Sequence, residues 1–371
     1  MQIKIKYFLT ILYLIPNCTF VFIITKMAFF IIMTIPIQNI YYLLCYAWNK
    51  LEEKDLVEVS AEESPDLLNL LARVLLNGTK TLLKRGLEQQ YLTETEVYQG
   101  IKGKLRLGQS LRKNLFQKGL AVCEFDELST NILANQILKT TLLNLYKTEG
   151  LETNLRYEMK AVFWRMNEVS KIQITDSVFK QIRINRNNSF YDFLLNVSEL
   201  VHHNLLPNQE KGHFKFKDFL RDERQMAKLF EEFIRNFYKI EVPEAKVYRE
   251  DLRWKMSGEN NTFLPKMQTD ISIKLGDRKL FIDAKYYTET LQKYYDTEKI
   301  HSQHLFQLFA YLKNQENPQA EGILIYPTIE KSLSLVFTHE GHKIRIETLN
   351  LNQDWKGIRG DLLYIIDYES A

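Results

Sequence analysis

Two aspartates and a lysine stand close together in TDISIKLGDRKLFIDAKYY, residues 269–287. Asp270 begins one apolar run, and Asp283 and Lys285 are two residues apart in the next. Side chains two apart on a strand share a face, so Asp283 and Lys285 are predicted to point the same way. The Gly-Asp-Arg sequence at 276–278 predicts a tight hairpin turn, which brings Asp270 to the same end of the sheet.

Such a set of residues favours a metal-dependent phosphodiesterase site. Two carboxylates at one point repel each other unless a cation joins them. Carboxylates, a main-chain carbonyl and water are the ligands that Mg²⁺ prefers. We therefore predict a Mg²⁺ site at Asp270, Asp283 and the carbonyl of Ala284, where the metal would activate water and stabilise charge on a phosphodiester. Lys285 would hold the attacking hydroxide or the phosphate.

The alternative is a surface hairpin whose charges meet only solvent, since Asp-x-Lys alone is a weak motif. Against it, Asp283 follows the apolar run Leu280–Ile282, where an unpaired charge is costly. A predicted helix over residues 300–313 also places Gln307 and Tyr311 one turn apart on one face.

The pattern D-x12-D-x-K followed by Q-x3-Y resembles the PD-(D/E)xK nuclease fold, in the form that carries a Gln-x3-Tyr helix. Thr269 stands where the written motif has proline. The resemblance implies catalytic roles for five residues: Asp270, Asp283, Lys285, Gln307 and Tyr311. It also implies a metal-binding glutamate from the preceding helix, for which Glu231 is preferred and Glu232 is the alternative.

A wider resemblance covers residues 35–326. Five segments together resemble McrC, the nuclease subunit of McrBC modification-dependent restriction systems. They are IPIQNIYYLLCYAW, YQGIKGKLRL, CEFDELSTNILANQILKTTLLNL, LFEEFIRNFY and HSQHLFQLFAYL. The resemblance implies an N-terminal part that docks on McrB, a GTP-hydrolysing AAA+ ring, and stimulates its GTPase. It implies a C-terminal domain that cuts double-stranded, 5-methylcytosine-containing DNA. A non-catalytic adaptor that only activates the ring is the alternative.

The expected fold class is α/β, or α+β overall. The elements expected before the nuclease region are a helix opened by Ser64, Pro65 and Asp66 and closed by Gly86, strands and turns over 91–122, and helices over 130–146, 155–171 and 190–206. The elements expected within the nuclease region are a helix over 226–238 and a mixed sheet flanked by helices. We place the polar boundary PNQEKG at 207–212, which gives an extension at 1–32, a partner-docking region at 33–212 and a nuclease domain at 213–371.

Composition narrows the class of protein. The chain has 371 residues, of which 45% are hydrophobic and 26% are charged, and its net charge is +3. These fractions exclude a wholly disordered, collagen-like or polytopic membrane chain. Three scattered cysteines favour a cytoplasmic protein without disulfides or structural zinc. No GxxxxGK[ST] motif occurs, so GTP is expected on the partner rather than on this chain.

The apolar run at residues 7–25 has several interpretations. It is long enough for a signal peptide or a single membrane anchor. Because the McrC-like pattern begins at Ile35, just after Met33, an upstream extension or a mistaken start is preferred, and no membrane partner is expected.

The pairs His202/His203 and His301/His304 are interpreted as surface or loop histidines in preference to metal ligands. His301 and His304 share a face with Gln307, so a contact with DNA phosphate stays open for them.

Overall fold

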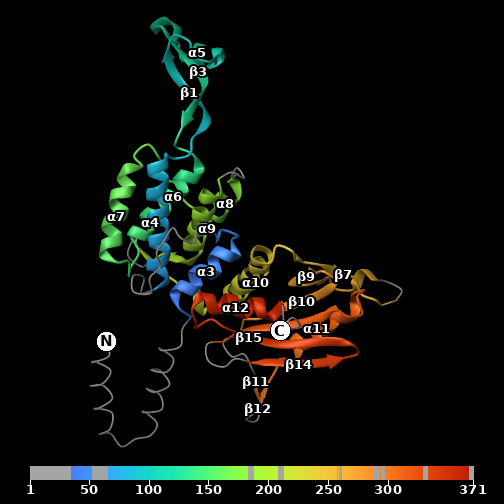
Figure 1. The fold of residues 1–371 in the computed structure, drawn as a ribbon. Coiled ribbons are helices and arrows are strands. Elements are labelled where there is room, and N and C mark those ends of the chain that lie inside the picture. Colours follow the sequence, from blue (N-terminus) through green and yellow to red (C-terminus); the bar gives the residue numbers. More distant parts are fainter. Residues whose placement is uncertain are drawn as a thin grey trace, which may run out of the picture. The chain divides into compact units, whose positions relative to one another are not determined.

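The computed structural model describes residues 35–51, 66–182, 188–207, 213–256, 258, 261–286, 292–294, 297–328 and 333–366. The chain forms two compact units (Figure 1). One contains residues 35–49 together with the described residues from Asp222 onward, and the other contains the described residues between Lys50 and Arg221. No helix within the described ranges is long and apolar enough to cross a membrane, and the run at 7–25 lies outside them.

The unit from Lys50 to Arg221 combines packed helices with a long antiparallel ribbon. Its helices are α4 (Leu67–Arg85), α5 (Leu107–Arg112), α6 (Leu133–Tyr146), α7 (Thr153–Arg165), α8 (Asp176–Gln181) and α9 (Ser189–Asn204), with 3-10 turns at Phe116–Lys118 and Phe219–Arg221. Its strands are β1 (Gln90–Gln99), β2 (Lys104–Leu105), β3 (Leu120–Ser129), β4 (Leu205–Pro207) and β5 (Phe214–Phe216). Figure 1 shows the β1–β3 ribbon extending away from α4, α6 and α7.

Helix α4 follows the predicted stripe, but it begins differently. Asp66 is itself the N-cap, because its carboxylate accepts a hydrogen bond of 2.9 Å from the backbone N–H of Asn69. Of the three residues predicted to open this helix, Asp66 is therefore the cap, and Ser64 and Pro65 lie outside the described residues. The helix ends before Gly86, as predicted, with Gly86 at φ +93°.

The other unit contains a six-stranded mixed sheet. Its strands, in the order β14-β15-β13-β10-β9-β6, are β14 (Ser334–His339), β15 (His342–Asn350), β13 (Glu321–Thr328), β10 (Arg278–Ala284), β9 (Ile271–Leu275) and β6 (Lys246–Tyr248). Short strands pair outside it: β7 (Asp251–Leu252) with β8 (Met267–Gln268), and β11 (Gln292–Tyr294) with β12 (Thr297–Lys299). A 3-10 turn lies at Asn261–Phe263. β13 runs parallel to β10 and β15, and the remaining pairs in the six-stranded sheet are antiparallel.

Helices cover both faces of this sheet, which confirms the predicted fold class. The helices that lie against the sheet are α10 (Glu223–Glu241), α11 (Ser302–Asn314) and α12 (Trp355–Ile366), and α3 (Ile37–Ala47) packs on α10. Leu308 and Tyr311 of α11 join a core with Phe281 and Leu324 on one face. Gly322 permits this close packing, because a Cβ there would lie 2.8 Å from the side chain of Leu308.

Helix α10 covers the opposite face. The ring of Phe230 on α10 lies 6.2 Å from the ring of Tyr286, measured between centroids. Tyr286 follows Lys285, and neighbouring residues at a strand end point to opposite faces. The side chains of Asp283 and Lys285 therefore face α11, away from α10.

The two compact units differ from the predicted domain boundaries at two places. The segment at 208–212 separates β4 from β5, but these strands pair with each other, so the first unit continues to Arg221. Helix α3 belongs with the C-terminal unit, because Tyr46 packs on Phe233 and Phe237 of α10, with centroids 5.9 and 5.4 Å apart, and Asn236 donates a 2.8 Å hydrogen bond to the carbonyl of Ala47.

Candidate active site

Asp270 and Asp283 face each other across two antiparallel strands. Ile271 pairs with Ile282 in the β9–β10 register, so the next pair along is Asp270 with Asp283. Directly opposed residues on antiparallel strands lie on the same face of the sheet. Gly276, at φ +57°, and Asp277 form the connecting turn, as the sequence predicts. The hairpin therefore brings the two carboxylates together.

Asp283 is a buried carboxylate without a normal hydrogen bond. Its side chain is 0% exposed, and neither oxygen accepts a hydrogen bond of ordinary geometry from any described residue. Burial, and then the adjacent Asp270 carboxyl, raise the pKa of Asp283 well above its usual range, against the lowering effect of Lys285. A buried carboxylate with open lone pairs is what a bound cation would satisfy.

Lys285 lies between the two carboxylates. Its Nζ is 2.6 Å from Oδ1 of Asp283 and 3.4 Å from Oδ2 of Asp270. Burial lowers the pKa of Lys285, but the charges of Asp283 and Asp270 outweigh burial and hold this pKa above its ordinary value. Lys285 is therefore an ammonium at neutral pH.

Gln307 and Tyr311 approach this cluster from α11. The side-chain N–H of Gln307 donates a 2.6 Å hydrogen bond to the Tyr311 hydroxyl, which donates one of 2.8 Å to the main-chain carbonyl of Gln268. Gln268 precedes Asp270 by two residues, so the Tyr311 contact holds the backbone that carries Asp270. Burial raises the pKa of Tyr311 to about 12, and the charges of Asp270 and Asp283 act in the same direction. Tyr311 therefore remains protonated and keeps donating.

The sequence interpretation of His304 as an exposed residue is wrong. His304 is only 5% exposed, and its Nδ1 lies 2.8 Å from the hydroxyl of Tyr326 on β13. Lys285 is close enough for its charge to influence the imidazole. Helical spacing from Gln307 is the sequence signal that places His304 near the site, but it does not reveal burial.

We expect His304 to remain neutral well below neutral pH. Burial, and then the charges of Lys285 and His301, lower its pKa to about 4. Since an unfolded histidine titrates near 6.5, the unfolded chain takes up more protons between these values, and His304 contributes a loss of stability as pH falls from about 6.5 towards 4. NMR titration of the imidazole resonances checks this, and a His304 midpoint between 6 and 7 would contradict it.

Glu231 is paired with two arginines. It belongs to α10, the helix that covers the face of the sheet opposite to Asp283. One of its oxygens lies 2.9 Å from Arg235 and also pairs with Arg249. Metal binding by Glu231 therefore stays a prediction that would require it to give up these arginines. Burial, and then the charge of Glu223 on α10, raise the pKa of Tyr286.

Within the described ranges, no three His, Cys, Asp or Glu side chains gather into a group that could hold a metal ion. An ion at Asp270 and Asp283 would thus need backbone oxygen and water as further ligands. Ala284 ends β10 immediately after Asp283, so its carbonyl is adjacent in the chain. His202 and His203 instead lie 3.4 and 3.5 Å from Asp176.

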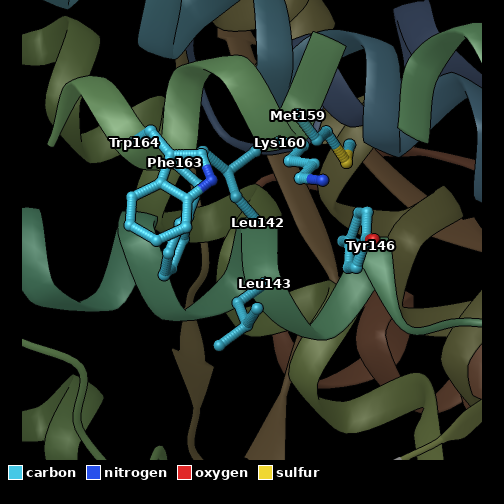
Figure 2. A pocket seen from close by; sticks show the side chains of 7 residues that line it. All are labelled: Leu142, Leu143, Tyr146, Met159, Lys160, Phe163 and Trp164. Atoms are coloured by element: carbon cyan, nitrogen blue, oxygen red, sulfur yellow. The ribbon is translucent and has the colours of Figure 1, made fainter. Parts of the chain in front are cut away.

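A separate pocket of about 140 Å³ lies between α6 and α7 (Figure 2). Its lining residues are Leu142, Leu143, Tyr146, Met159, Lys160, Phe163 and Trp164. None of these side chains is a carboxylate, imidazole or thiol, so the pocket offers no site for the predicted hydrolysis.

Comparison with known proteins decides the family. A family model described as "McrBC 5-methylcytosine restriction system component" matches residues 36–327. An Escherichia coli (strain K12) relative, "Type IV methyl-directed restriction enzyme EcoKMcrBC", is 35% identical over 339 residues, which is 90% of this chain and 97% of the relative. This chain belongs to the McrBC family. The resemblance to McrC inferred from the sequence is thereby confirmed.

A solved structure agrees on the fold of this McrBC-family chain. The "refined half-complex from tetradecameric assembly of Thermococcus gammatolerans McrB AAA+ hexamers with bound McrC" contains a chain that matches with a TM-score of 0.57 and 18% identity. The match covers 89% of this chain and 76% of that one. At this identity, the match establishes a shared fold.

Proposed function

We propose that this chain is the nuclease subunit of a McrBC-like, 5-methylcytosine-dependent restriction system. In this proposal the sheet unit is a PD-(D/E)xK nuclease domain that hydrolyses DNA phosphodiester bonds with Mg²⁺. The observation that carries the proposal is the buried Asp283, opposed by Asp270 across the hairpin and contacted by Lys285. Membership of a restriction-system family supports the same reaction class.

The residues present fit a Mg²⁺ ion. Asp270, Asp283 and the Ala284 carbonyl would hold it, because hard oxygen ligands suit Mg²⁺ and neither oxygen of Asp283 accepts a hydrogen bond of ordinary geometry, although Lys285 lies beside Oδ1. When bound, Mg²⁺ supplies positive charge at the phosphate and promotes deprotonation of water. Lys285 is poorly suited to take a proton, since its raised pKa keeps it charged. Its ammonium instead holds the negatively charged phosphate or hydroxide in place.

Tyr311 acts as a positioning residue in this mechanism. Its hydroxyl fixes the Gln268 carbonyl, and Gln307 fixes that hydroxyl. Both contacts determine where β9 begins and hence where Asp270 lies relative to Asp283. Small displacements of a reacting constellation reduce rates strongly.

We expect Tyr311→Phe to reduce DNA cleavage about 10- to 100-fold without preventing folding, because the ring still fills the core beside Phe281. Raising the Mg²⁺ concentration should restore part of the lost rate if Asp270 is merely displaced. Cleavage rates measured against Mg²⁺ concentration check this. If the Tyr311→Phe chain cuts at the unsubstituted rate at every Mg²⁺ concentration, Tyr311 does not position Asp270 for cleavage.

The proposal includes a partner. The Thermococcus gammatolerans structure is described as McrB AAA+ hexamers with bound McrC, and the E. coli relative as methyl-directed. By analogy, we infer that this chain docks on an McrB-like ring, stimulates its GTPase and receives methylated double-stranded DNA from it in the cytoplasm. The unit from Lys50 to Arg221 is the proposed docking region. GTP would bind the ring, since this sequence has no GxxxxGK[ST] motif.

The test is a reconstituted reaction that contains the chain, an McrB-like partner, GTP, Mg²⁺ and methylated duplex DNA. We expect cutting to require Mg²⁺ and Asp283, while stimulation of GTP hydrolysis requires neither Asp283 nor Lys285. Unchanged cutting without Asp283 would contradict the assignment of the site. GTPase stimulation without any cutting by the unsubstituted chain would instead identify a non-catalytic adaptor.

A further inference from the structure

The loop between β7 and β8 presents apolar side chains to solvent. Within residues 253–266, Phe263 is 85% exposed and Met256 is 55% exposed. Phe263 is the most exposed large hydrophobic side chain among the described residues. Phe263 is the last residue of a 3-10 turn at Asn261–Phe263.

The base of this loop is held in place. The indole N–H of Trp254 donates a 2.6 Å hydrogen bond to the carbonyl of Pro265, across the loop. Lys255 reaches the end of α11, where its backbone N–H bonds to the side chain of Asn314 at 2.6 Å and its ammonium to the carbonyl of Gln315 at 2.5 Å. The loop is thus tied to the helix that carries Gln307 and Tyr311.

The loop also leads directly into the candidate site. Its second strand, β8, ends at Gln268, whose carbonyl accepts from Tyr311, and Asp270 follows. Phe263 lies seven residues before Asp270 in the sequence, which limits their separation to about 25 Å. This distance is less than one turn of duplex DNA, about 34 Å. A duplex cut at Asp270 would therefore be within reach of Phe263.

The charge of the loop favours a polyanion. Residues 253–266 include Arg253, Lys255 and Lys266 against the single acid Glu259, a net charge of +2. Arg253 and Lys266 are both exposed, and Lys266 also lies 3.0 Å from the exposed carboxylate of Asp251. In DNA-binding proteins, lysine and arginine commonly bind phosphates, and a neighbouring apolar side chain can insert between the bases.

We propose that Phe263 is a wedge that inserts between stacked base pairs of the DNA beside the cleaved bond, with Arg253 and Lys266 on the flanking phosphates. Insertion would open the base step and hold the duplex in register with Asp270 and Asp283. This inference rests on the proposed nuclease function and adds to it the residues that would position the substrate.

The test uses the full-length chain with Asp283→Asn, so that DNA is bound but not cut, and a fluorescently labelled methylated duplex. Phe263→Ala should weaken binding about 10-fold, the loss expected for one aromatic–base stack. Phe263→Trp should retain binding, and its added tryptophan emission, relative to the chain with Phe263, should be quenched by DNA. Phe337→Ala is the matched control: Phe337 is 49% exposed on β14, at the far edge of the sheet, and should bind DNA normally.

Two results would overturn the wedge. One is unchanged DNA affinity for Phe263→Ala with no quenching in Phe263→Trp. The other is a Phe263→Ala chain that binds DNA normally but fails to bind the McrB-like ring, which would make the loop a protein contact. Failure of the nuclease proposal is separately visible, because it appears as an absence of cutting by the unsubstituted chain in the reconstituted reaction.

Discussion

Asp283→Asn is expected to abolish DNA cleavage, with a loss of at least about 1000-fold, while leaving the fold as stable as before or more so. Asparagine has nearly the same shape but lacks the charge that would bind Mg²⁺. Removal of a buried carboxylate without normal hydrogen bonds relieves the desolvation that raises its pKa. A residue that served only the fold would show the opposite pattern, with lost stability and unaltered chemistry.

The stability gain from Asp283→Asn has a defined pH dependence. The folded pKa of Asp283 lies well above its usual value, so the folded chain takes up a proton before the unfolded chain does. The carboxylate is therefore most destabilising above its folded pKa, and its cost declines as pH falls towards 4. The gain in thermal midpoint should be present at neutral pH in metal-free buffer and should shrink with acidification.

Asp277→Asn is the matched control for this experiment. Asp277 lies in the exposed turn of the same hairpin, so the same chemical change there should alter neither cleavage nor the thermal midpoint appreciably. Addition of Mg²⁺ should raise the thermal midpoint of the unsubstituted chain and the Asp277→Asn chain, because a ligand that binds only the folded state stabilises it. A Mg²⁺-induced rise of equal size in Asp283→Asn would contradict the metal assignment.

Lys285→Met is expected to reduce cleavage about 100- to 1000-fold and also to destabilise the metal-free chain. The Lys285 ammonium is the cation that the structure places beside both carboxylates. Because its folded pKa is raised, its contribution is fully present below about 10 and would be lost only as pH rises through the raised value. The destabilisation should be large at pH 7, and it should diminish at acidic pH for a separate reason, which is that Asp283, whose pKa is raised, takes up a proton there.

Two variants sharpen the Lys285 prediction. Lys274→Met removes an exposed lysine from β9 of the same hairpin and should change neither cleavage nor stability. Lys285→Arg keeps the charge, and it should recover stability better than cleavage, because a longer planar cation cannot place a point charge at the same position. If Lys285→Met retained the unsubstituted cleavage rate, Lys285 would have only a structural role.

The site could be predicted from the sequence because it depends on local geometry. Alternation along a strand relates Asp283 to Lys285, and a two-residue turn fixes how Asp270 faces Asp283. Helical spacing relates Gln307 to Tyr311 in the same way. Each of these relations involves residues that are close together in the sequence, so each can be predicted without knowing the tertiary packing.

Packing between distant segments could not be predicted from the sequence. The pattern LFEEF shows that Glu231 lies on a helix, but only the contact of Phe230 with Tyr286 places that helix on the face away from Asp283. The aromatic run around Tyr46 predicts that Tyr46 is buried, but it does not show that α10 is the helix against which Tyr46 packs. His304 has ordinary surface-helix neighbours in sequence, and only the contact with Tyr326 shows that it is buried.

Cleavage of methylated duplex DNA by the chain with its McrB-like partner, GTP and Mg²⁺ tests the central claim most directly, with Asp283→Asn measured beside the unsubstituted chain. We predict rapid cutting by the unsubstituted chain and none by Asp283→Asn, with equal stimulation of GTP hydrolysis by both. Equal cutting by the two chains would contradict the assignment of Asp270, Asp283 and Lys285 as the nuclease site.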